Sequence, residues 1–149
     1  MFRHGHRLFS IASIGMILVA ALHIAGQYSA AVEEFAASPA FAAMQAFRFE
    51  LMFGNPLMTD LFDGLNAAFV ILLMWAGLIN LLIARYTGLR DKLMRRVCTL
   101  NLIGVGALIV FFAINDLLVH AVALGIVEIL FFVARFRLRR SRILPAAKH

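Results

Sequence analysis

Long apolar runs alternate with short charged segments in this chain, and the sign of the charge alternates as well. Thirteen of the fourteen Lys and Arg residues precede the first run, separate the second from the third or follow the fourth: Arg3, Arg7, Arg85, Arg90, Lys92, Arg95, Arg96, Arg135, Arg137, Arg139, Arg140, Arg142 and Lys148. Six of the eight acids lie in the other segments: Glu33, Glu34, Glu50, Asp60, Asp63 and Asp116. Because basic residues stay on the cytoplasmic side of a membrane, we predict an even number of spans with both termini cytoplasmic.

The four apolar runs have the length of membrane-spanning helices, which need about 20 residues each. We place the spans at about 8–27, 60–84, 97–114 and 117–134. The chain is 63% hydrophobic, whereas roughly half of a soluble domain is apolar. The predicted fold class is therefore all-α, an integral membrane four-helix bundle that forms a single transmembrane domain over 1–149.

The long first outer loop has its own helix signal. Ser38 is a good N-cap, and Pro39 suits the first helical position. Good helix formers and four phenylalanines follow up to Phe53, before the sequence Gly54-Asn55-Pro56, which is typical of a helix end. We predict a short amphipathic helix at about 39–53.

The net charge of +6 does not indicate a nucleic-acid partner, because the positive charge is confined to one side of the predicted membrane. There it can pair with anionic lipid head groups, at about 1 kcal/mol per Lys or Arg. We therefore predict membrane lipids as partners, no nucleic acid, and a multi-pass protein of the bacterial inner membrane. The single cysteine, Cys98, excludes a disulfide framework within one chain.

No catalytic or metal-binding motif is present in the sequence, so we predict no metal site. A membrane enzyme such as an isomerase, with Glu128 or Asp63 as acid or base, is a less favoured alternative that stays open. In each span, however, polar and small residues recur at spacings of three and four, so that they share one face. These faces should turn inward, because lipid cannot hydrogen-bond them. The predicted stripes are Ser13, Met16, Ala20, His23, Gln27; Asp63, Asn66, Val70, Leu73, Gly77, Asn80; Asn101, Gly104, Leu108, Phe111, Asn115; and His120, Leu124, Glu128, Phe131, Arg135.

Counting 1.5 Å per residue from the outer ends of the spans predicts one layer of polar residues: His23, Asp63, Asn66, Asn115, Asp116 and His120. Glu50 lies above it on the predicted surface helix. Glu128 is deeper, near the middle of a span, where a carboxyl group must be neutral or paired. We expect its partner to be Asn80, Asn101 or the polar head of a ligand. The predicted ligand-binding residues are His23, Glu50, Asp63, Asn66, His120 and Glu128.

Three stretches carry a resemblance to a known family: Met44–Gly54 (MQAFRFELMFG), Thr59–Asn66 (TDLFDGLN) and Gly77–Leu82 (GLINLL). The chain resembles DoxX-like proteins, which are small bacterial membrane proteins of four helices. The resemblance implies inside termini and a long first outer loop, and it carries no catalytic residue onto this sequence.

Two functions are nearly level on these observations. The first is binding of a lipid-like or other amphipathic small molecule in an outward-facing polar cavity. The alternative is an accessory structural subunit of a larger membrane complex, with partner subunits or a homo-oligomer left open. A haem held by His23 and His120 is a less favoured alternative, because two histidines without a further motif are a weak signal.

Overall fold

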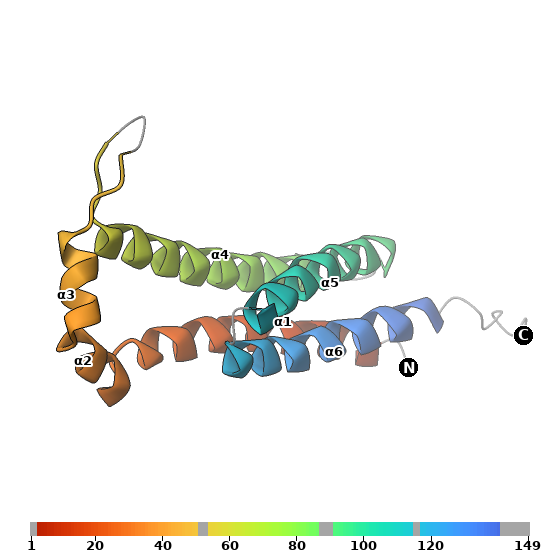
Figure 1. The fold of residues 1–149 in the computed structure, drawn as a ribbon. Helices are drawn as coiled ribbons and strands as arrows, with labels where there is room; N and C mark the ends of the chain where they lie inside the picture. Colours follow the sequence, from red (N-terminus) through yellow and green to blue (C-terminus); the bar gives the residue numbers. More distant parts are fainter. Residues whose placement is uncertain (1–2, 51–53, 87–90, 115–116, 141–149) are drawn as a thin grey trace, which may run out of the picture. The chain divides into compact units, whose positions relative to one another are not determined.

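The computed structural model describes residues 3–50, 54–86, 91–114 and 117–140, and these residues are almost entirely helical (Figure 1). Their helices are α1 (Arg3–Gly26), α2 (Ala30–Ala36), α3 (Pro39–Ala46), α4 (Met58–Tyr86), α5 (Asp91–Ile114) and α6 (Leu118–Arg140). The described part of the chain contains no β-strand beyond one isolated bridge, between Arg48 and Leu57. The prediction of an all-α fold is confirmed.

Four helices are long and apolar enough to cross a membrane. Their candidate spans are His4–Gly26, Met58–Tyr86, Lys92–Ile114 and Leu118–Leu138, of 23, 29, 23 and 21 residues. The protein is therefore a multi-pass membrane protein with four spanning helices, as predicted. The third spanning helix, α5, begins at Asp91, six residues before the predicted start of the third span at about 97. Lys and Arg side chains at a span end can extend toward water while their backbone stays helical.

The outer segment begins its helix as predicted and ends it earlier. The Ser38 hydroxyl accepts a hydrogen bond from the Phe41 amide at 3.2 Å, with Pro39 in the first turn of α3. The predicted helix over 39–53 is corrected, because α3 ends at Ala46 and Phe47 is extended. The backbone then pairs with itself: the Met58 amide donates to the Phe47 carbonyl at 2.9 Å. Residues 51–53 of the predicted helix lie outside the described residues, and α2 was not predicted.

α4 begins at Met58, two residues before the predicted start of the second span. The Asp60 carboxylate accepts a hydrogen bond from the Leu57 amide at 3.2 Å. A side chain in the first turn that bonds the backbone N–H just before the helix satisfies one of its free donors. Asp60 thus caps the start of α4.

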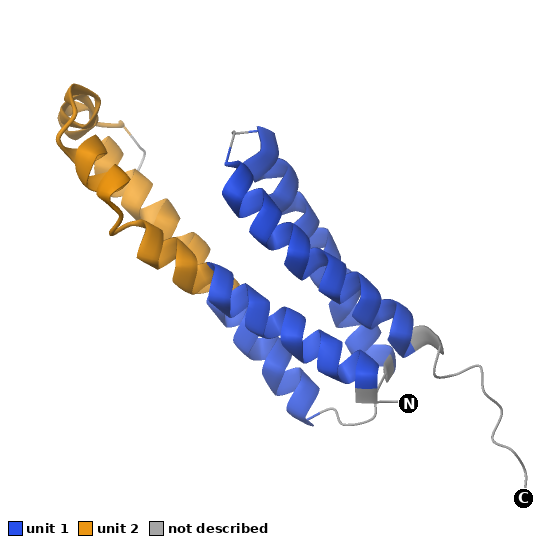
Figure 2. Cartoon of the chain, turned by 90° about the horizontal axis from the view of Figure 1, so that it is seen from below, with its two compact units in different colours: residues 1–19, 74–149 blue, residues 20–73 orange. Residues whose placement is uncertain are grey.

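The chain divides into two compact units, which Figure 2 colours separately. Unit 1 comprises residues 1–19 and 74–149, and unit 2 comprises residues 20–73. Unit 1 thus holds most of α1, the second half of α4, and all of α5 and α6. Unit 2 holds the end of α1, the helices α2 and α3, and the first half of α4.

The core of unit 1 is built on two phenylalanines, one from α1 and one from α6. Phe9 and Phe131 are both fully buried, and their rings meet edge to face with centroids 5.7 Å apart. A Cβ on Gly5 would meet the Leu138 side chain at 3.0 Å, and a Cβ on Gly15 would meet Val127 at 3.0 Å. Low numbers on α1 therefore pair with high numbers on α6, so these two helices are antiparallel.

In unit 1, α1 and α4 approach each other closely at Gly77. A Cβ placed on Gly77 would lie 2.8 Å from the Ser13 carbonyl oxygen and 2.7 Å from the Ile17 side chain. Small residues allow such close approach between helices in membranes. Gly77 belongs to the predicted inward stripe of the second span, and so does Asn80, one turn later on α4. Both residues are buried, as predicted.

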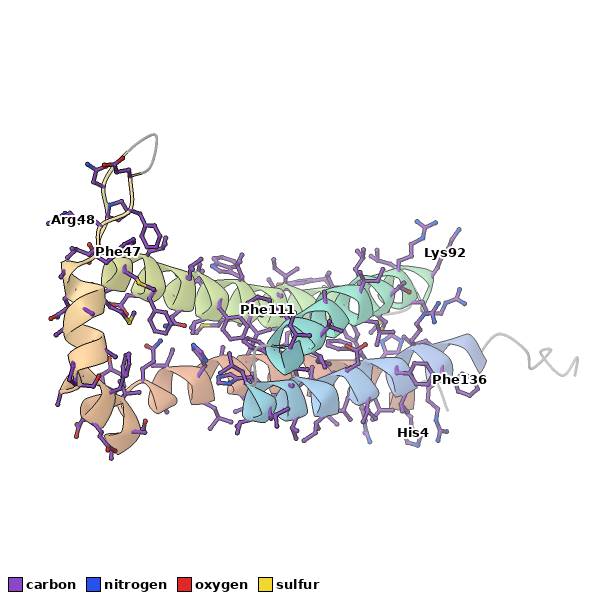
Figure 3. All side chains as sticks on the ribbon, viewed as in Figure 1. His4, Phe47, Arg48, Lys92, Phe111 and Phe136 are labelled. Atoms are coloured by element: carbon purple, nitrogen blue, oxygen red, sulfur yellow. The ribbon has the colours of Figure 1, made fainter. Side chains whose placement is uncertain are left out.

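The predicted inward stripe of the third span is correct at Asn101 and Leu108 and wrong by one residue at Gly104 and Phe111. Val105 and Phe112 of α5 are 2% and 7% exposed, whereas Phe111 is 54% exposed. Figure 3 labels Phe111 on α5. Gly104 also faces outward. The correct stripe runs through Met94, Cys98, Asn101, Val105, Leu108 and Phe112. Asn115 lies outside the described residues.

The predicted stripe of the fourth span is correct at its centre and wrong at its end. Leu124 and Phe131 of α6 are fully buried, whereas Arg135 is exposed. The buried side continues through Ala134 and Leu138 instead. Glu128 is half-buried and follows the buried Val127, so it lies at the edge of the buried side of α6.

Unit 2 packs far less tightly. Between residues 21 and 69, no side chain that the structure describes is buried. Its aromatic contacts are local: Phe35 and Phe41 meet edge to face at 5.6 Å, joining α2 to α3. His23 of α1 and Phe69 of α4 meet in the same way at 5.0 Å.

Candidate functional site

The six predicted ligand-binding residues belong to different units. His23, Glu50, Asp63 and Asn66 lie in unit 2, and His120 and Glu128 lie in unit 1. Each group is therefore described on its own.

In unit 2, the histidine is the best packed of the four predicted residues. His23 is half-buried with its ring against Phe69. Asn66 is half-buried and lies one helical turn before Phe69 on α4, while Asp63 and Glu50 are exposed. His23 and Asn66 thus offer polar groups beside an aromatic ring, and the two acids offer negative charge at the surface.

In unit 1, His120 lies in the first turn of α6. Its ring stacks on Phe112 of α5, with centroids 5.2 Å apart and planes inclined by 28°. Glu128 follows two turns later, so the two side chains are about 12 Å apart along the helix. Both lie on the side of α6 that faces α5.

Glu128 lies against a glycine of the neighbouring helix. A Cβ on Gly106 of α5 would meet the Glu128 Oε1 atom at 3.4 Å. The other carboxyl oxygen, Oε2, is buried and has no hydrogen-bond partner among the described residues. Buried polar groups in folded proteins almost always have a partner, and a bilayer core offers no water to supply one. Glu128 is therefore the side chain in this part of the chain that most needs a partner.

The asparagines predicted as partners of Glu128 are instead paired with each other. The Asn80 Nδ2 group donates to Asn101 Oδ1 at 3.0 Å, and the Asn101 Nδ2 group donates to Asn80 Oδ1 at 3.2 Å. Asn101 Nδ2 also donates to the Val97 carbonyl at 2.9 Å, and Asn80 Nδ2 contacts the Met16 sulfur at 3.7 Å. The pair links α4 to α5, as expected of polar groups that join helices in a membrane. The prediction that it serves Glu128 is wrong, because its hydrogen bonds are used within the pair.

The chemistry that Glu128 offers is that of one carboxyl group in an apolar setting. It can bond the hydroxyl or amino group of an amphipathic molecule. In the part of the chain that the structure describes, no group of three or more His, Cys, Asp or Glu side chains is arranged to hold a metal ion. The absence of a cofactor stays a prediction, and His23 and His120, the two ligands of the less favoured haem alternative, belong to different units.

Comparison of the chain with protein-family models, with curated proteins and with solved structures finds no match. The resemblance to DoxX-like proteins accordingly stays a prediction, and the functional argument depends on the residues of this chain alone.

One candidate site was missed by sequence reasoning. A cavity of about 380 Å³ lies at the basic end of α5 and α6 and is lined by Lys92, Arg95, Arg96, Thr99, Phe132, Arg135 and Phe136. The sequence placed these cations in two separate clusters with a general role toward lipid. Their helical spacing was the available signal. Arg95 and Arg96 lie three and four residues after Lys92 and four and three before Thr99, and Arg135 and Phe136 lie three and four residues after Phe132.

Proposed function

We propose that this protein binds a lipid-like or other amphipathic small molecule in an outward-facing polar cavity within the membrane. The observation that carries the proposal is the buried Oε2 atom of Glu128, which has no hydrogen-bond partner among the described residues. Leaving a buried acceptor unpaired costs about 1–3 kcal/mol. A ligand whose polar head donates a hydrogen bond would remove that cost while its apolar body stays among the helices.

The proposed ligand has a hydroxyl or amino head group and an apolar body. Gly106 supports this arrangement, because the absence of a side chain there leaves room for the carboxyl group beside α5. His120 and its ring contact with Phe112 would contribute a second polar group and an apolar wall on the same side of α6. The other four predicted residues, His23, Glu50, Asp63 and Asn66, lie in unit 2, and their role in ligand binding stays a prediction.

Replacement of Glu128 tests the proposal. The full-length protein and its Glu128→Gln variant are purified in mild detergent, and the organic extract of each is examined by mass spectrometry. We expect a small molecule that is near-stoichiometric in the parent and reduced at least about tenfold in Glu128→Gln, since a bond to a charged group contributes about 1.5–3 kcal/mol. Glu33→Gln, which changes an exposed acid of α2, should retain it.

Two outcomes would count against this function. If the extracts of the parent and of Glu128→Gln have the same composition, Glu128 holds no ligand. If a second protein purifies in constant proportion and no small molecule does, the accessory-subunit alternative is favoured.

We further propose that the protein lies in the bacterial inner membrane with both termini in the cytoplasm. The alternation of basic and acidic segments supports this orientation. A thiol label that cannot cross the membrane should react from outside with Ala37→Cys, and should react with Tyr86→Cys only after lysis. Both positions are exposed, and the native Cys98 is fully buried. The reverse labelling pattern would invert the orientation.

A further inference from the structure

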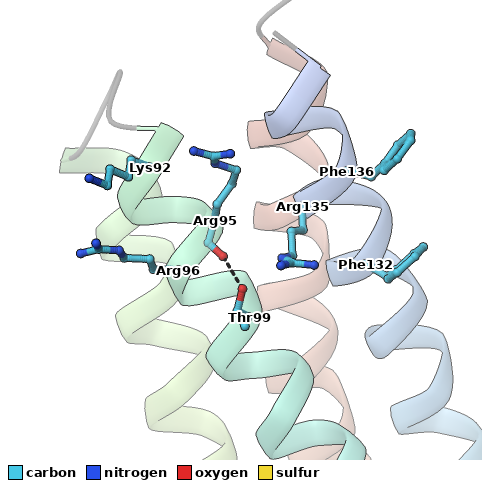
Figure 4. Close-up of a pocket in the computed structure, with 7 residues that line it drawn as sticks. All are labelled: Lys92, Arg95, Arg96, Thr99, Phe132, Arg135 and Phe136. Carbon is cyan, nitrogen blue, oxygen red and sulfur yellow. Dashed lines mark hydrogen bonds between the residues drawn. The ribbon is translucent and has the colours of Figure 1, made fainter. Parts of the chain in front are cut away.

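The basic end of α5 and α6 forms a groove with a composition unlike the rest of the described surface. Of its seven lining residues, four are cationic, two are phenylalanines and one is threonine. Figure 4 shows Arg95 of α5 and Arg135 of α6 in the space between the two helices, with Phe132 and Phe136 extending from α6. All of these residues belong to unit 1.

The groove gathers positive charge without an acid among its described lining residues. The nearest acid in the sequence is Asp91 at the start of α5, and one carboxylate cannot balance four cations. The positive end of the α5 dipole adds to the field, since Lys92 lies in the first turn. Like charges held together in this way favour a bound anion.

The side chain of Arg95 gives independent support for a bound anion in the groove. The Nε atom of Arg95 is buried and has no hydrogen-bond partner among the described residues. The Thr99 hydroxyl does not serve it, because that hydroxyl donates to the Arg95 carbonyl oxygen at 2.9 Å. Arg95 therefore has a free donor that faces away from water, in a place where its neighbours are cationic.

Phosphate is the anion that matches these donors. Guanidinium groups bind phosphate oxygens through paired N–H groups, and Arg95 and Arg135 approach the same space from two helices. Phe132 and Phe136 are 60% and 48% exposed beside the charges, so a ligand there meets an apolar surface as well as cations. Basic pockets between spanning helices are known to hold lipid head groups.

We propose that this groove binds the phosphate group of an anionic membrane lipid, whose acyl chains lie along Phe132 and Phe136. The site is separate from the one proposed around Glu128, in ligand and in residues. Its occupant would fix the ends of α5 and α6 at the membrane surface.

The test is a lipid titration of the delipidated full-length protein in a neutral detergent, followed by native mass spectrometry. We expect the parent to retain phosphatidylglycerol in preference to phosphatidylcholine. The double variant Arg95→Gln/Arg135→Gln should bind phosphatidylglycerol at least about tenfold more weakly, at about 1 kcal/mol per charge near the surface. The variant Arg95→Lys/Arg135→Lys should lose less, because it keeps the charge and loses only the paired donors.

Arg137→Gln is the matched control, because Arg137 is an exposed arginine of α6 that does not line the groove. It should weaken binding much less than the double variant does, because one charge is removed in place of two and that charge lies outside the groove, where salt screens it. An equal loss in Arg137→Gln would show that general surface charge attracts the lipid, and equal retention of both lipids would show that the phosphate charge is not selected. Either result overturns the proposal. If the double variant does not retain its helical circular dichroism, Arg96→Gln, which changes an exposed lining residue, replaces it with the same expected direction.

Inorganic phosphate provides the second arm. An excess of inorganic phosphate should weaken lipid binding only slightly, because it cannot use the apolar side of the groove. Complete displacement of the lipid would assign the groove to a free anion and overturn the lipid proposal. Glu128→Gln should bind phosphatidylglycerol as the parent does, so this result and that of the Glu128 experiment are independent.

Discussion

The two units of this chain share the helices α1 and α4 but differ in how they pack. In unit 1, Phe9, Met94, Leu124 and Phe131 are each fully buried. In unit 2, no described side chain between residues 21 and 69 is buried. A helix can thus be tightly packed over one half and loosely packed over the other, because packing depends on its neighbours and not on its own apolar content.

The hydrogen bonding of the α4 asparagines also differs between the two units. The buried asparagine of unit 1 on α4, Asn80, is closed into a reciprocal pair with Asn101. Asn66 lies on the same helix in unit 2. It is half-buried, and its side chain has no hydrogen-bond partner among the described residues. The paired asparagines of unit 1 thus join two helices, whereas the Asn66 side chain of unit 2 is open to a ligand or to water.

Two glycines of α4, one in each unit, test this difference in packing, and Gly77→Ala should give the largest change in stability. Gly77→Ala places a methyl group 2.8 Å from the Ser13 carbonyl oxygen, which the backbone of α1 cannot easily avoid. We expect it to lower the free energy of unfolding by about 1–3 kcal/mol, as overpacking usually does. Equilibrium unfolding in mixed micelles of mild and denaturing detergent would measure the change.

Gly64→Ala is the control for this variant, on the same helix but in unit 2. A Cβ there meets no atom within 4 Å, so the change should be neutral or stabilising by up to roughly 1 kcal/mol through helix propensity. Equal destabilisation by the two alanines would remove the contrast between the units.

The asparagines should give a smaller effect. Asn80→Leu leaves the Asn101 amide without its partner and should reduce stability by about 1 kcal/mol, the usual contribution of such bonds in membranes. Asn66→Leu breaks no described hydrogen bond and should change stability by less than about half of that. The same unfolding measurement applies.

A double-mutant cycle sharpens this second comparison. Asn80→Leu and Asn101→Leu should be non-additive, because each single change already removes the pair. Additive effects would mean that the two amides act separately, and the contrast with Asn66 would then need another cause.

Much of the fold could be predicted from the sequence because the membrane imposes simple requirements. A span needs about 20 apolar residues, and caps such as Ser38 depend only on local chemistry. The inward stripe of α5 was less predictable. Phe111 and Phe112 are equally apolar, and lipid accepts either one, so helical spacing alone could not decide that Phe112 is the buried residue.

The outer segment shows a second limit of the sequence. Good helix formers continue past Ala46, yet α3 ends there. The Phe47 carbonyl is bonded by the Met58 amide, a partner eleven residues away. Local propensity is a weak influence that such contacts override.

The two candidate sites also differ in how far the sequence could predict them. The sequence identified Glu128 as an unusual carboxyl group, because its position in an apolar run is enough to make it so. Its neighbour Gly106 and its lack of an asparagine partner depend on which side of α6 meets α5. The groove of Arg95 and Arg135 could not be read from two clusters forty residues apart.

The sequence by itself determined the membrane class, the number of spans and the positions of the charged ends, because transfer of apolar and charged groups between water and lipid depends on each residue separately. The tertiary structure decided which residues lie together: Asn80 bonds Asn101, Glu128 lies against Gly106, and Arg95 and Arg135 line one cavity. These meetings depend on the rotation and register of each helix, which an apolar solvent on every side leaves almost unspecified until the helices pack.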